Sequence, residues 1–151
     1  MNKCRTITRL LVSDGLAADL QPLIQGSKLK TVSLGTASDP LAWITDQLNN
    51  QRKQGNCIEE LHLMAHGSAE GIQLGGQRID AASLFTKAKE LTSWQIKKLV
   101  LWSCEIGSNQ PFIKQLSDST QAEVFSSEQL VNNGNAWLHS NQGQSIHADE
   151  I

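Results

Sequence analysis

Residues 61–68 read LHLMAHGS, a short apolar run that stops abruptly at His66 and Gly67. A second run of the same kind, LVLWSCEIG at residues 99–107, stops at Cys104. Both runs predict buried strands of a parallel sheet. Because ligands bind at the carboxyl ends of such strands, we expect His66 and Cys104 to converge there, although 104 − 66 = 38 residues separate them in sequence.

The segments around these two runs alternate between strand and helix signals. The clearest helix prediction begins with Asp39 as N-cap and Pro40 in the first turn, and it ends before Gly55. A Gly-Gly step within residues 71–79 predicts a small β-hairpin after the His-Gly strand. The remaining predictions are strands at 7–12, 29–34, 122–125 and 136–139, helices at 16–24, 80–91 and 109–118, and a frayed tail at about 141–151.

This order of elements predicts an α/β fold. We expect a three-layer, Rossmann-like sandwich with a mostly parallel central sheet, formed by a single domain over residues 1–151. The net charge is −2 and no run of 18 apolar residues occurs, so we expect neither nucleic acid binding nor membrane insertion. The glycines do not form a phosphate-binding motif, and we expect no cofactor.

The three cysteines, Cys4, Cys57 and Cys104, are an odd number at unmatched spacing. This pattern argues against a disulfide framework and leaves at least one free thiol. The apolar stretch near the N-terminus is too short for a signal peptide. These features predict a cytoplasmic protein, or one exported without an N-terminal signal peptide as part of a larger chain.

A His and a Cys at neighbouring strand ends could act as a general base and a nucleophile. A thiol attacks a carbonyl well only after losing its proton, and an ordinary Cys has a pKa of about 8.5. His66 could take that proton and return it to a leaving amine, and a helix opening near Ser108 would aim its positive end at Cys104. The backbone N–H groups of Gly67 and Cys104 are the predicted oxyanion donors.

The same residues carry a family resemblance. A strand, His66-Gly67-Ser68, a spacer, a second strand and Ser103-Cys104-Glu105 resemble the caspase-like cysteine peptidases, which include caspases, gingipains, separases and CHAT domains. Within that group, His66, GIQLG at residues 71–75 and Cys104 are most similar to the bacterial family called domain of unknown function 4347. The resemblance spans about residues 9–131. It implies a caspase-like sheet with a His66/Cys104 dyad, often at one end of very large exported, adhesin-like proteins.

The resemblance also implies a substrate pocket. Asp14 follows the first strand, where caspase-like enzymes hold the residue before the scissile bond, and a carboxylate there would favour Lys or Arg. Ser103 and Glu105, which flank the nucleophile, are assigned to the same pocket. The alternative for Asp14 is a solvated Asp-Gly turn. The charge of Glu105 would raise the pKa of the neighbouring thiol unless its side chain points away.

Two functions therefore remain open. The first is a caspase-like cysteine peptidase that cleaves peptides or proteins, including its own parent chain, through an acyl-enzyme on Cys104. The second is a non-catalytic module that keeps the fold in a large surface protein, with His66 and Cys104 as core residues or a decayed site. A metal site at His62 and His66 with Cys57 or Cys104 is disfavoured, because no ligand recurs at the spacing of zinc sites.

Overall fold

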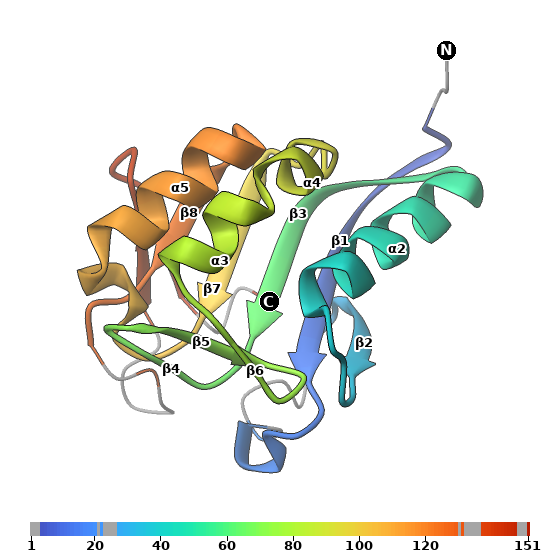
Figure 1. Ribbon diagram of the computed structural model, residues 1–151. Coiled ribbons are helices and arrows are strands. Elements are labelled where there is room, and N and C mark those ends of the chain that lie inside the picture. Colours follow the sequence, from blue (N-terminus) through green and yellow to red (C-terminus); the bar gives the residue numbers. More distant parts are fainter. Residues whose placement is uncertain (1–3, 21, 23–26, 130, 132–136, 148–150) are drawn as a thin grey trace.

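A seven-stranded sheet forms the centre of the computed structural model, which describes residues 4–20, 22, 27–129, 131, 137–147 and 151 (Figure 1). The strand order is β10-β9-β8-β7-β3-β1-β2. Within this sheet β1, β2, β3, β7 and β8 pair in parallel, and β9 and β10 add antiparallel strands at one edge. The prediction of an α/β fold with a mostly parallel sheet is confirmed. The strands are β1 (Thr6–Asp14), β2 (Lys30–Leu34), β3 (Asn56–Met64), β7 (Lys98–Trp102), β8 (Glu123–Ser126), β9 (Trp137–Ser140) and β10 (Ser145–His147).

The helix predicted from the Asp39-Pro40 pair is confirmed as α2 (Pro40–Lys53). Asp39 Oδ1 accepts a hydrogen bond from the Ala42 N–H at 3.2 Å, which satisfies one of the free donors at the helix start. Leu41, Ile44 and Leu48 repeat at helical spacing and are buried against the sheet. The other helices are α3 (Ala81–Thr86), α4 (Ala88–Thr92) and α5 (Gln110–Thr120), with short 3₁₀ turns η1 (Ala18–Leu20) and η2 (Ile106–Ser108).

All four of these α-helices pack on one face of the sheet, as Figure 1 shows, and they share one hydrophobic cluster with its strands. The opposite face carries a second cluster, called here the far-face cluster. In the described part of the chain, Leu20, Leu29, Val131 and Ile151 cover that face from outside the strands, whereas α2, α3, α4 and α5 do not contribute to it. The far-face cluster consists of Leu11, Leu29, Met64, Val100, Trp102, Phe125, Val131, Leu138 and Ile151, with Leu20, Cys104 and Ile146 packed against it.

Several element predictions need correction. Of the helix expected at 16–24, the structure describes η1 and a helical Pro22, and residues 21, 23 and 24 lie outside the described residues. The helix expected at 80–91 is divided at Lys87 into α3 and α4. The last predicted helix is capped by Asn109, not Ser108, because η2 comes between it and Cys104. Over its described residues the tail is not frayed as predicted, since β10 pairs with β9 and Ile151 is buried.

The segment predicted as a simple hairpin belongs to a three-stranded antiparallel sheet. Its strands are β4 (Gly67–Ser68), β5 (Gly71–Leu74) and β6 (Gln77–Ile79). Gly75 and Gly76 form the tight turn between β5 and β6 with φ values of 60° and 82°, a conformation that glycine adopts at no steric cost. The strand β4 begins at Gly67, so this small sheet starts directly at the predicted site.

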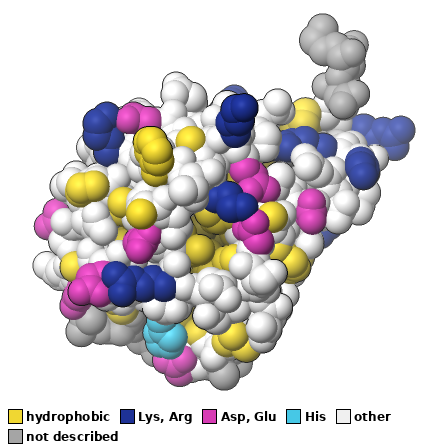
Figure 2. All heavy atoms as spheres, viewed as in Figure 1, with side chains coloured by type: hydrophobic (Ala, Val, Ile, Leu, Met, Phe, Trp, Pro, Cys, Tyr) yellow, Lys and Arg dark blue, Asp and Glu magenta, His cyan; other side chains and the backbone are white. Residues whose placement is uncertain are grey.

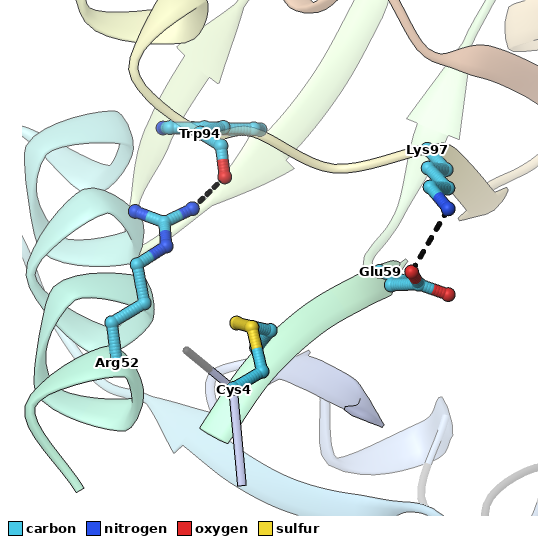
Figure 3. Close-up of a disulfide and its surroundings, with 6 residues drawn as sticks. Cys4, Arg52, Glu59, Trp94 and Lys97 are labelled. Carbon is cyan, nitrogen blue, oxygen red and sulfur yellow. Dashed lines mark hydrogen bonds and ion pairs between the residues drawn. A yellow bond between two sulfur atoms is a disulfide. The ribbon is translucent and has the colours of Figure 1, made fainter. Parts of the chain in front are cut away.

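A disulfide joins Cys4 to Cys57, so the expectation drawn from cysteine spacing is wrong for this pair (Figure 3). The two Cα atoms lie 5.5 Å apart. The strands β1 and β3 start side by side, with Thr6 opposite Asn56, and this pairing brings Cys4 to Cys57. The bond therefore lies at the amino ends of the strands. Cys104 remains the free cysteine, as predicted.

Candidate functional site

The strands β3 and β7 are direct parallel neighbours, and their register places His66 and Cys104 at the same edge of the sheet. Met64 lies opposite Trp102, and two further residues along each strand lead to His66 and Cys104. The Ser103 hydroxyl donates a buried 2.9 Å hydrogen bond to the Ala65 carbonyl, which joins the two strand ends directly. We call this end of the sheet, where β1, β3, β7 and β8 terminate, the carboxyl edge.

The carboxyl ends of β1 and β3 also flank the point where the strand order reverses. The chain runs from β1 outward to β2 and then returns past β1 to β3. In open α/β sheets a crevice forms at this point and takes up ligands. Asp14 ends β1 and His66 follows β3, so both residues lie at this position.

Gly67 lies so close to the second strand end that it has no room for a side chain. A Cβ at this position would lie 2.8 Å from Ser103 Cβ and 3.0 Å from the Cys104 carbonyl oxygen. Glycine is therefore required at position 67 because the His-Gly segment packs closely on the Ser-Cys segment. The sequence alone did not reveal this reason. The predicted oxyanion role of the Gly67 N–H group is compatible with this contact and stays a prediction.

Replacing Gly67 by Ala should force these segments apart. We expect the free energy of unfolding to fall by about 1–3 kcal/mol, the usual cost of overpacking. Gly35→Ala is the matched control, because nothing lies within 4 Å of a Cβ built there. That variant should change stability by less than about 0.5 kcal/mol. Urea unfolding of both variants measures the difference, and equal midpoints would contradict the close contact.

The His66 imidazole points to an acidic residue that the sequence reasoning did not select. Its Nε2 atom lies 2.9 Å from Asp19 Oδ1, with the two side chains 50% and 67% exposed. Asp19 belongs to η1, which follows β1 across the carboxyl edge. Only the neighbouring positions of β1 and β3 in the sheet could have indicated this pair, since 47 residues separate its members.

The Cys104 thiol is half-buried and packs against the far-face cluster. Its Sγ atom accepts a hydrogen bond from the Val131 N–H at 3.3 Å. Among the residues that the structure describes, no hydrogen bond joins His66 to this thiol. The two candidate catalytic side chains thus share one edge of the sheet but are each engaged by another partner.

The three predicted pocket residues have different environments. Asp14 is only 4% exposed, and its Oδ1 accepts from the Leu16 N–H at 3.1 Å and the Gly75 N–H at 3.4 Å. The turn expected at Asp14-Gly15 is present, but the alternative that it is solvated is wrong. Ser103 is buried and its hydroxyl is already used at Ala65. Glu105 adopts a left-handed backbone conformation with a φ of 60°, and its N–H donates to the Gln129 carbonyl.

A buried polar network lies beside the site on the far face. The His62 Nδ1 atom accepts a 2.9 Å hydrogen bond from the Trp102 indole N–H, so Nε2 must carry the ring proton and donate to Glu60 at 2.6 Å. This hydrogen bond from His62 holds the pKa of the Glu60 carboxyl below its usual range, against the opposing effect of burial, and the charges of Arg9 and Lys98 add to it. The network leaves His62 no free lone pair for a metal.

One comparison with known proteins identifies the family. A family model described as "Domain of unknown function (DUF4347)" matches residues 10–150. The chain belongs to the DUF4347 family. No curated protein and no solved structure matches this DUF4347 chain. Membership therefore supports the resemblance to that family and supplies no activity.

Three further features of the DUF4347 chain concern membranes, metal ions and surface charge. Among the described helices, none is long and apolar enough to cross a membrane. Within the same described residues, His, Cys, Asp and Glu do not gather in any group of three that could hold a metal ion. On the face shown in Figure 2, Lys and Arg side chains are interspersed with Asp and Glu, without a large patch of one sign.

Proposed function

We propose that this DUF4347 domain is a caspase-like cysteine peptidase with Cys104 as nucleophile and His66 as general base and acid. The observation that carries the proposal is the register of β3 and β7, which continues to His66 and Cys104 at one edge of the sheet. That edge is also where the strand order reverses. We also propose that the α/β sheet of this domain has the caspase fold.

The proposed reaction runs through a thioester. His66 takes the proton from the Cys104 thiol, and the sulfur attacks the carbonyl carbon of the scissile peptide bond. The backbone N–H groups of Gly67 and Cys104 stabilise the oxyanion. His66 then protonates the leaving amine as the C–N bond breaks, and water hydrolyses the thioester to release the acid and the thiol.

The proposed reaction requires a change in the present hydrogen bonding of His66 and Cys104. His66 is paired with Asp19, and the thiol accepts from the Val131 N–H. Hydrogen bonds of catalytic groups are often long or misaligned without substrate and tighten in the complex. The substrate carbonyl would enter between the imidazole and the sulfur.

A substrate with Lys or Arg before the scissile bond fits the proposed site best. Asp14 is a buried carboxylate at the carboxyl edge, and it makes no ion pair within the described part of the chain. Its partners are the neutral N–H groups of Leu16 and Gly75, so the positive charge of a substrate side chain would add the ion pair that the carboxylate lacks. The parent chain of a larger protein is one candidate substrate.

The disulfide bears on where such a peptidase would work. Disulfides form and persist in oxidising compartments and are rare in the cytosol. The Cys4–Cys57 bond therefore favours the second of the two predicted locations, export within a larger protein, over the cytoplasm.

A peptide library with an amidomethylcoumarin leaving group tests the activity. We expect turnover with preference for Lys or Arg before the leaving group, and a loss of about 10⁴-fold or more in Cys104→Ala. Turnover that survives this substitution, or a preference for acidic residues, would contradict the proposal.

A non-catalytic module is the second candidate, favoured by the missing hydrogen bond between His66 and the thiol. Iodoacetamide separates the two functions at pH 6–7. Because Cys4 and Cys57 are disulfide-bonded, the reference thiol must be free glutathione. An activated Cys104 should react at least about tenfold faster than glutathione, because its thiolate forms more readily. A slower reaction together with no peptide turnover would favour the module.

A further inference from the structure

We infer that Asp19 is the positioning residue of the site, which fixes the tautomer and the orientation of the His66 imidazole. The inference rests on the proposed function for its catalytic meaning, but the contact itself does not. Asp19 Oδ1 lies 2.9 Å from His66 Nε2. Neither sequence pattern nor family resemblance pointed to this residue.

The chemistry of the pair determines where the imidazole proton lies. A carboxylate only accepts hydrogen bonds, and a neutral imidazole has one N–H donor and one acceptor nitrogen. Because Asp19 contacts Nε2, that nitrogen carries the proton. Nδ1 then keeps the lone pair, and it is the atom that can take the proton from the Cys104 thiol. After that transfer the imidazolium is positively charged, and the Asp19 carboxylate stabilises it.

The backbone that carries Asp19 is held in place, although the Asp19 side chain is exposed. The Ala17 N–H donates to the Asp14 carbonyl at 3.0 Å, and the Leu20 N–H donates to the Ala17 carbonyl at 3.0 Å. Leu20 also packs against the far-face cluster, the same cluster that Cys104 contacts. The turn that carries Asp19 is thus anchored to the end of β1 on one side and to the core on the other.

A structural role explains this pair less well than a positioning role. Both side chains are at least half exposed, and exposed ion pairs contribute little to stability. His66 is further fixed by its backbone, since its carbonyl accepts from the Gln73 N–H at 2.8 Å. Removing the Asp19 carboxylate should therefore leave the fold intact while it releases the imidazole ring.

The test combines kinetics with a readout that needs no turnover. In Asp19→Ala we expect kcat to fall by about tenfold to a hundredfold with KM unchanged, because Asp19 acts through His66 and does not touch the substrate. Asp19→Glu should restore part of kcat. Imidazole ¹⁵N shifts at pH 8.5 should show His66 as one tautomer, protonated at Nε2, in the native protein and as a mixture in Asp19→Ala.

Asp46→Ala is the matched control, since it removes an equal charge from an exposed position on α2. It should change neither kcat nor the His66 tautomer, and all variants should melt like the native protein. An unchanged kcat in Asp19→Ala, with the native tautomer, would overturn the role of Asp19 while the peptidase proposal stands. A tautomer change without any native turnover would support the positioning of His66 and count against the peptidase proposal.

Discussion

His62→Ala is expected to lower the free energy of unfolding by about 3–5 kcal/mol. His62 is 0% exposed, and its Nδ1 is the acceptor for the buried Trp102 indole N–H. Removing the imidazole leaves that N–H without a partner. It also opens a cavity next to the Trp102 ring, at the place on β3 that the His62 ring occupies. Both effects add to the loss of the hydrogen bond to Glu60. Urea unfolding followed by Trp fluorescence measures the change.

The control for this prediction is another histidine of the chain. His139 is exposed on β9, and its imidazole Nδ1 lies 2.8 Å from the Ser145 hydroxyl. His139→Ala should stay within about 0.5 kcal/mol of the native protein. His62→Gln should recover part of the loss, because its amide oxygen can accept from the indole N–H. If both alanine variants unfold alike, the buried network does not stabilise the fold as described.

The parts of the fold that the sequence predicted are those with a strong local signal. The two apolar runs that end at His66 and Cys104 became the adjacent central strands β3 and β7. The Asp39-Pro40 pair marked the start of α2 because capping and proline geometry act within one turn. For such features the physical cause lies within a few residues, so the pattern alone is sufficient.

The features that the sequence did not predict depend on pairing between distant strands. The Cys4–Cys57 bond forms because β1 and β3 begin side by side, and cysteine spacing holds no information about that pairing. The contact of Asp19 with His66 has the same origin, at the other end of the same two strands. Periodicity likewise cannot show that α2, α3, α4 and α5 all cover one face, since each amphipathic helix would look the same on either side.

Loss of the disulfide is the second large effect that we expect. The bond links residues 53 apart in sequence, and closing a loop of that size stabilises the native state by about 4 kcal/mol in the chain-entropy model. The double variant Cys4→Ser/Cys57→Ser should lose about 2–4 kcal/mol of unfolding free energy relative to the oxidised native protein. The native protein in reductant should lose a similar amount, and the variant should not respond to reductant.

The reactivity of Cys104 should not change when the disulfide is lost. The disulfide lies at the amino ends of β1 and β3, whereas His66 and Cys104 lie at the carboxyl edge. Below the unfolding transition, Cys104 should therefore react with iodoacetamide at the same rate in the folded variant as in the native protein. A slower reaction in the variant would mean that the amino ends of the strands set the geometry of the carboxyl edge. Equal unfolding with and without reductant would mean that the bond does not restrict the unfolded chain.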